Sequence, residues 1–125
     1  MASHNQLGKA GEQAAVEFLI TQGLVIRETN WRLNNLEVDI IAQGPGMRLH
    51  IVEVKTRSSD RYFDPMRSIT SAKKQHMVNS ANGYIRYYQL KCEIQYDVII
   101  LIGTPDNFKL EYYPNLFTPR LKTYR

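Results

Sequence analysis

The chain has 125 residues, 43% of them hydrophobic, which is enough for one folded domain with its own core. Lys and Arg number 16 against 12 Asp and Glu, and the net charge of +4 favours an anionic partner such as nucleic acid over a basic one. The single cysteine, Cys92, excludes an internal disulfide, and the longest aliphatic run, Val98–Ile102, is too short to cross a membrane, so we expect a cytoplasmic protein without a membrane partner.

Hydrophobic spacing predicts two helices and five strands. In chain order these are a helix (4–22), three strands (24–33, 36–42 and 48–57), a helix (67–89) and two strands (94–102 and 108–113). Gly23 is placed to end the first helix, and Asn34–Asn35 and Gly44–Gly46 are placed as turns between strands. The order α-β-β-β-α-β-β predicts the α/β class, with a mixed central sheet flanked by helices.

Two further expectations concern the second half of the chain. The aliphatic run within 94–102 is typical of a central or parallel strand, and 108–113 is expected at an edge of the sheet. The inward stripe of the long helix is expected to include Ala72, Met77, Ala81, Tyr84 and Tyr88. We expect one domain over 1–125, with a basic tail over 114–125 that is either packed or mobile.

Charged residues interrupt two of the predicted strands. Alternation places Glu53 and Lys55 on one face of the strand 48–57, and Asp39 on one face of the strand 36–42 together with Glu37 and Ile41. If these strands pair as a hairpin, the side chains of Asp39, Glu53 and Lys55 meet near one end of the sheet. Two converging carboxylates repel each other, and a Mg²⁺ or Mn²⁺ ion would relieve that repulsion. The pattern is therefore compatible with metal-assisted hydrolysis of a phosphodiester, in which Lys55 orients the attacking water.

A simpler interpretation fits the same residues. Glu53 and Lys55 can form a solvated strand face, with a cross-strand ion pair to Asp39 that contributes less than about 1 kcal/mol. Spacing alone does not separate a metal site from such a face.

A resemblance to a known family separates them. The segments GKAGEQAAVEFLITQGLVIRETNWR, LEVDIIA, IVEVKTR and YDVI resemble the YraN-like family of small bacterial proteins, from Gly8 to about Ile102. Asp39 with Glu53-Val54-Lys55 is also similar to the D…(D/E)-x-K signature of restriction-endonuclease-like nucleases, which include the archaeal Holliday-junction resolvases. The resemblance implies a restriction-endonuclease-like fold and a nuclease ancestry.

The resemblance also implies a set of site residues. It places Asp39, Glu53, Lys55 and Glu12 in the catalytic site, with Asp39 and Glu53 as metal ligands and Glu12 as a third ligand or the holder of a metal-bound water. From periodicity alone Glu12 would be an ordinary surface residue. Motif positions of unclear role fall on Glu37, Arg57 and Asp97, and the chain has Leu36 where the family usually has glycine.

Basic residues follow the strand that carries Glu53. These are Arg57, Arg61, Arg67, Lys73 and Lys74, which we expect to contact nucleic-acid phosphates or to form a solvated surface. His4, His50 and His76 lack the spacing of metal ligands, and structural or surface roles are expected for them.

The resulting functional hypothesis is a nuclease that uses Mg²⁺ or Mn²⁺ to cut DNA, with branched DNA as one substrate. The alternatives are a nucleic-acid-binding module of the same fold without efficient chemistry, and a protein-interaction role. By analogy with resolvase-like relatives, the nuclease hypothesis also includes a homodimer.

Overall fold

The helices and strands follow the predicted order. The computed structural model describes residues 4–59, 67 and 69–119. Its elements are α1 (His4–Thr21), β1 (Val25–Leu33), β2 (Leu36–Gln43), the short 3₁₀ turn η1 (Pro45–Met47), β3 (Leu49–Arg57), α3 (Ser71–Tyr88), β4 (Ile94–Thr104) and β5 (Asn107–Phe117). This confirms the α/β class and the order α-β-β-β-α-β-β.

The five strands form one mixed sheet. Their order is β1-β2-β3-β4-β5, with β3 and β4 parallel and the other neighbouring pairs antiparallel. The prediction of a central or parallel strand is confirmed by β4, which lies inside the sheet and parallel to β3, and β5 lies at an edge as expected. Because β5 extends to Phe117, residues 114–117 of the expected tail belong to the sheet. Residues 120–125 of that tail lie outside the described residues.

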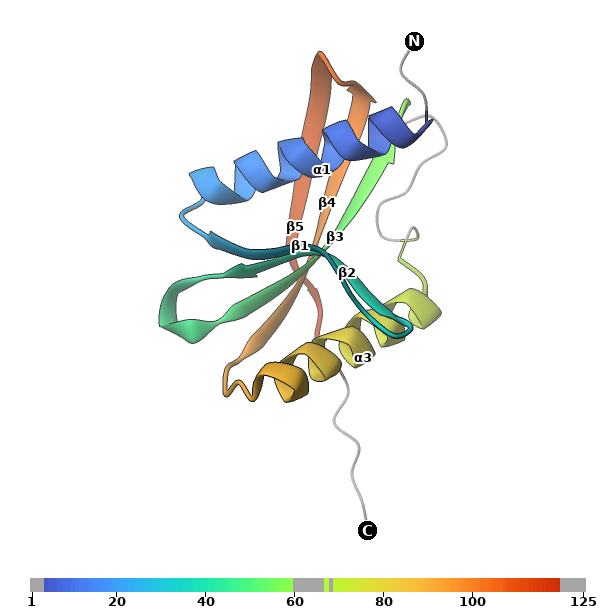
Figure 1. Cartoon of the computed structure of the whole chain (residues 1–125). Coiled ribbons are helices and arrows are strands. Elements are labelled where there is room, and N and C mark those ends of the chain that lie inside the picture. The colour runs from blue at the N-terminus through green and yellow to red at the C-terminus, as the bar shows by residue number, and fades with distance from the viewer. Residues whose placement is uncertain (1–3, 60–66, 68, 120–125) are drawn as a thin grey trace.

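The two helices cover opposite faces of the sheet (Figure 1). On the α1 side, Ala15 and Leu19 pack against Ile40, Val52 and Ile99. The core on the α3 side is larger and includes the aromatic residues Trp31, Tyr84 and Tyr96. The centres of the Trp31 and Tyr84 rings lie 5.1 Å apart in an edge-to-face arrangement. The core therefore has two layers, as expected for a sheet covered on both faces.

The ends of the helices follow from local chemistry. Gly23, with φ of +85°, ends α1 as predicted, since glycine adopts this left-handed conformation without strain. Helix α3 begins later than predicted because Thr70 caps it, its hydroxyl accepting a hydrogen bond from the Lys73 N–H at 3.1 Å. Ala72 and Tyr88 are exposed, so their predicted inward positions are wrong; both lie in terminal turns of α3.

Two glycines allow a helix to approach the sheet closely. A Cβ atom at Gly11 of α1 would collide with the Thr56 side chain of β3, so this position brings α1 against the end of β3. A Cβ atom at Gly83 of α3 would collide with Leu36. Leu36 therefore packs into a space that a glycine in the facing helix provides.

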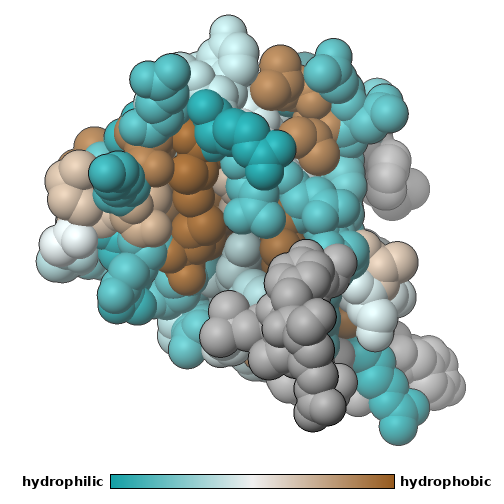
Figure 2. Space-filling model, turned by 90° about the horizontal axis from the view of Figure 1, so that it is seen from below, coloured by the Kyte–Doolittle hydropathy of each residue, from teal (hydrophilic) through white to brown (hydrophobic). Residues whose placement is uncertain are grey.

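The surface on the α3 side is mainly polar. Figure 2 shows this side, with hydrophilic side chains around narrow strips of apolar surface. Within the described part of the chain, neither helix is long and apolar enough to span a lipid bilayer.

Candidate metal and nuclease site

Strands β2 and β3 separate at the two acidic residues. The antiparallel pairing runs from Gln43–Leu49 to Ile40–Val52, and Asp39 and Glu53 are the next residues on each strand. The Asp39 carboxylate takes the place of the next ladder bond, because its Oδ2 accepts a hydrogen bond from the Val54 N–H at 2.8 Å. The predicted hairpin is confirmed, and it brings these two acids together.

Strand β2 does not alternate regularly at this point. Val38 and Ile41 both belong to the core on the α3 side, whereas Ile40 belongs to the core on the α1 side. On the neighbouring strand β1, Asn30 has φ of +51°, a left-handed conformation that bends the strand. The expectation that Glu37, Asp39 and Ile41 share one face, which assumed a regular strand, therefore fails.

Burial hinders the ionisation of both acids, and the charge of Asp39 further hinders that of Glu53. Burial raises the pKa of Asp39, although the hydrogen bond from Val54 and the charge of Lys73 oppose this rise. Burial and the negative charge of Asp39 raise the pKa of Glu53 to about 7. At neutral pH the pair therefore carries less than two negative charges, and a bound cation would favour full ionisation.

Two ammonium groups share one oxygen of Glu53. The Lys55 Nζ lies 3.7 Å from Glu53 Oε1, and the Lys73 Nζ lies 3.2 Å from the same atom. The contact to Lys55, two residues along β3, was expected. The closer contact to Lys73 of α3 was not, since Lys73 was expected to contact nucleic-acid phosphates or to form part of a solvated surface. No local sequence pattern predicts the contact between Lys73 and Glu53, because it depends on how α3 packs against the sheet.

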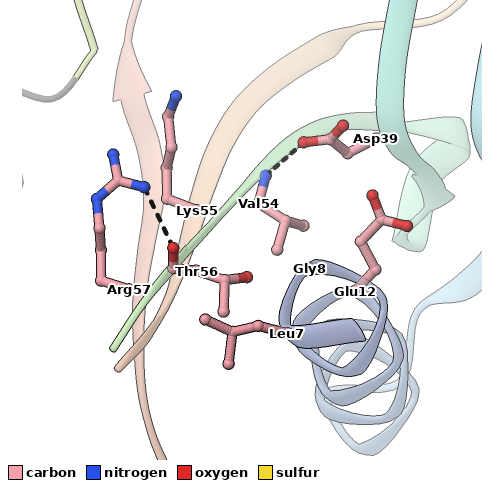
Figure 3. Close-up of a pocket in the computed structure, with 8 residues that line it drawn as sticks. All are labelled: Leu7, Gly8, Glu12, Asp39, Val54, Lys55, Thr56 and Arg57. Carbon is pink, nitrogen blue, oxygen red and sulfur yellow. Dashed lines mark hydrogen bonds between the residues drawn. The ribbon is translucent and has the colours of Figure 1, made fainter. Parts of the chain in front are cut away.

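A cleft of about 240 Å³ opens on the α1 side of Asp39. Figure 3 shows Glu12 of α1 and Asp39 of β2 directed toward the same space beside Val54. The Glu12 carboxylate also accepts a hydrogen bond from the Asn30 side chain at 3.0 Å. The structure thus brings Glu12 into the cleft with Asp39.

The three acids do not form one ligand cluster. Among residues 4–59, 67 and 69–119, no three His, Cys, Asp or Glu side chains lie close enough together to hold a metal ion. Asp39 and Glu53 interact directly, but Glu12 reaches the site only through the cleft on the other side of Asp39. This arrangement fits two direct carboxylate ligands and a more distant carboxylate that acts through water.

The basic residues that were expected to contact phosphates lie in different parts of the structure. Arg57 lines the cleft and is exposed, Arg67 is exposed, and Lys73 contacts Glu53. Lys74 lies elsewhere, with its ammonium 5.7 Å from the centre of the Phe117 ring of β5. Arg61 lies outside the described residues.

Sequence reasoning missed a second buried acidic site around Asp97 of β4. Its side chain is fully buried and accepts hydrogen bonds from the Tyr112 hydroxyl at 2.8 Å and the Asn115 N–H at 2.9 Å. The Gln95 side chain donates at 2.9 Å, and the His50 Nδ1 lies 2.8 Å from Oδ2. Burial raises the pKa of Asp97, but these hydrogen bonds together outweigh it and lower the pKa. The available signal was an acidic residue inside a predicted strand, directly before its aliphatic run.

Comparisons with known proteins identify close relatives of the chain. The uncharacterised protein family UPF0102 matches residues 11–101. A UPF0102 protein of Bacteroides fragilis is 43% identical over 97% of this chain and 99% of its own length. A UPF0102 protein of Flavobacterium psychrophilum is 44% identical over 94% of this chain and 98% of its own length, and one of Bacteroides thetaiotaomicron is 40% identical over 97% and 99%.

Proposed function

The chain belongs to the uncharacterised protein family UPF0102, and we propose that it is a nuclease that hydrolyses DNA phosphodiester bonds with Mg²⁺ or Mn²⁺. One observation carries this proposal. Two carboxylates from neighbouring strands, Asp39 and Glu53, are held together in a partly buried position where both have raised pKa values. Such crowding costs stability and is common at functional sites. We further propose that the mixed sheet is a restriction-endonuclease-like one.

The chemistry of the acids fits a hard divalent cation. Mg²⁺ and Mn²⁺ prefer oxygen ligands, and Mg²⁺ usually keeps several waters beside one or two carboxylates. Asp39 and Glu53 would be the two protein ligands, because they already interact and each would ionise more readily beside a positive charge. The bound cation would supply Lewis-acid chemistry and a water of lowered pKa.

The residues around the acids have separate tasks in this proposal. Lys55, with its ammonium 3.7 Å from Glu53, would orient the attacking water and offset the negative charge that develops on the phosphate. Glu12, held by Asn30, would accept a hydrogen bond from water in the cleft. Arg57 lines the same cleft and would contact a phosphate of the DNA backbone.

One observation favours the second candidate, a nucleic-acid-binding module without efficient chemistry. Glu53 already has two ammonium partners, so its charge is compensated without a metal ion. A site of this kind could bind DNA through Arg57 and the lysines and still not turn over. Binding without cleavage would distinguish this module from a nuclease.

A cleavage assay with matched variants tests the proposal. The protein is incubated with linear, flapped and four-way DNA in Mn²⁺, beside Asp39→Asn, Glu53→Gln and Lys55→Ala. We expect each variant to lose at least about 100-fold in rate, because residues that act as a unit fail together. Glu93→Gln is the control, since Glu93 is an exposed acid that pairs with Arg48 at 2.6 Å. It should cut normally. Cleavage that survives in all three site variants would refute the assignment.

A further inference from the structure

Lys73 of α3 is the closer of the two ammonium groups at Glu53. Its Nζ lies 3.2 Å from Glu53 Oε1, against 3.7 Å for Lys55, and its side chain is 28% exposed. Because the Glu53 side chain is only 11% exposed, this contact lies largely out of water. Lys73 therefore occupies a part of the site that the short motif on β3 does not describe.

The position of Lys73 in its helix is electrostatically unfavourable. Thr70 caps α3, so Lys73 is the third residue of the first turn, where the helix dipole presents positive charge. Acidic side chains are favoured there, and this turn contains none. The acids of β2 and β3 offset this cost. The first turn of α3 thus aims a cation at the two carboxylates.

Both acids respond to this cation. The charge of Lys73 lowers the pKa of Asp39 as well as that of Glu53, and for Glu53 its effect exceeds that of Lys55. Lys73 is thus the principal positive charge beside the acid pair in the described part of the structure. A divalent cation at the same carboxylates would lie next to this ammonium and be repelled by it.

We propose that Lys73 is a placeholder cation, which occupies the side of Glu53 that a divalent metal ion needs and competes with that ion for the carboxylate. This inference rests on the proposed function, because it assumes that Asp39 and Glu53 bind the metal. The ammonium keeps the two acids together before the metal arrives. Metal binding then requires the flexible lysine side chain to move away from Glu53.

The test measures metal affinity rather than cleavage. Mn²⁺ is titrated into the full-length protein, and free Mn²⁺ is followed by electron paramagnetic resonance. Lys73→Met removes the charge but keeps most of the side-chain length, and we expect it to bind Mn²⁺ at least about fivefold more tightly. Lys73→Arg keeps the positive charge and should stay close to the wild-type affinity. Lys74→Met is the matched control, because its ammonium lies over Phe117, and it should not change the affinity.

The outcomes separate this inference from the proposed function. If the wild type binds Mn²⁺ and Lys73→Met binds it equally or more weakly, the placeholder role is wrong and the nuclease proposal stands. If neither protein binds Mn²⁺ in the millimolar range, the metal site itself is wrong. Lys73→Gln repeats the measurement with a polar side chain, so that a local folding defect of one variant does not decide the result.

Discussion

Two buried acidic sites in the same sheet have opposite electrostatics. Asp97 of β4 is surrounded by hydrogen-bond partners from three strands, and its pKa is lowered. Asp39 and Glu53 of β2 and β3 face each other with few backbone donors, and their pKa values are raised. The residue types are the same, and the difference lies in what surrounds them.

This difference bears on the roles of the two sites, a structural one for Asp97 and the proposed chemical one for Asp39 and Glu53. The Asp97 charge is balanced by donors that the fold itself supplies, so ionisation strengthens the native state. The pair of Asp39 and Glu53 is weakened by ionisation unless a cation is added. A protein gains nothing in stability from such a pair, which supports a functional role for it.

Of the substitutions that test this comparison, we expect one at Asp97 to change the free energy of unfolding most. In Asp97→Asn, an NH₂ group replaces either Oδ1, which accepts from Gln95 and Asn115, or Oδ2, which accepts from Tyr112, so a donor faces donors in either orientation. We expect the free energy of unfolding to fall by about 3–5 kcal/mol, because a buried charged network loses its centre. Urea denaturation followed by circular dichroism measures this.

A substitution that removes only one hydrogen bond to Asp97 provides the control for that measurement. Tyr112→Phe removes one donor to Asp97 and leaves the carboxylate, so it should cost only about 1–2 kcal/mol. If Asp97→Asn destabilises the protein no more than Tyr112→Phe does, the Asp97 site is not a structural centre and the comparison fails.

The second prediction concerns the pH dependence of stability at Glu53. Its pKa is raised from 4.5 to about 7, so the native state binds more protons than the unfolded state between these values. Stability contributed by protonated Glu53 is complete below about pH 4.5 and is lost as pH rises through about 7, a loss of about 3 kcal/mol. In Glu53→Gln this loss should disappear. Unfolding free energies of both proteins from pH 4 to 8 measure it.

Asp97 should show the opposite slope when the same measurements are extended below pH 4. Because its pKa is lowered, its contribution is present above the unfolded value of 3.8 and is lost as pH falls through the lower native value. A parallel pH dependence of wild type and Glu53→Gln between pH 4.5 and 7 would show that Glu53 is not the group responsible.

Much of the fold was predictable from the sequence because local signals agreed. Gly23 ended the first helix, Asn34–Asn35 formed the first hairpin turn, and the aliphatic run at 98–102 lay in a central strand. The wrong predictions concern which residues are buried, because tertiary packing decides this. Ala72 and Tyr88 have the right spacing for the inward stripe of α3, but they lie in its first and last turns, where both are exposed.

The candidate site was predictable only in its short-range part. The hairpin brought Asp39 and Glu53 together because its register follows from the turn and the apolar pattern. The contact of Lys73 with Glu53 depends on how α3 packs across the chain, and the partners of Asp97 come from residues as distant as His50 and Asn115. No local pattern encodes such contacts.

The smallest effect, and the most direct test of the contrast, is stabilisation by metal. At a tenfold excess over its dissociation constant, Mn²⁺ should raise the unfolding free energy of the wild type by about 1.4 kcal/mol. Asp39→Asn should lose most of this gain. In EDTA the same variant should be at least as stable as the wild type, because asparagine still accepts the hydrogen bond from Val54 and no longer repels Glu53. Thermal melts in EDTA and in Mn²⁺ measure both effects. A clear loss of stability in EDTA, with a wild type indifferent to Mn²⁺, would mean that Asp39 is a structural acid like Asp97 and that the sheet has two stabilising sites instead of one.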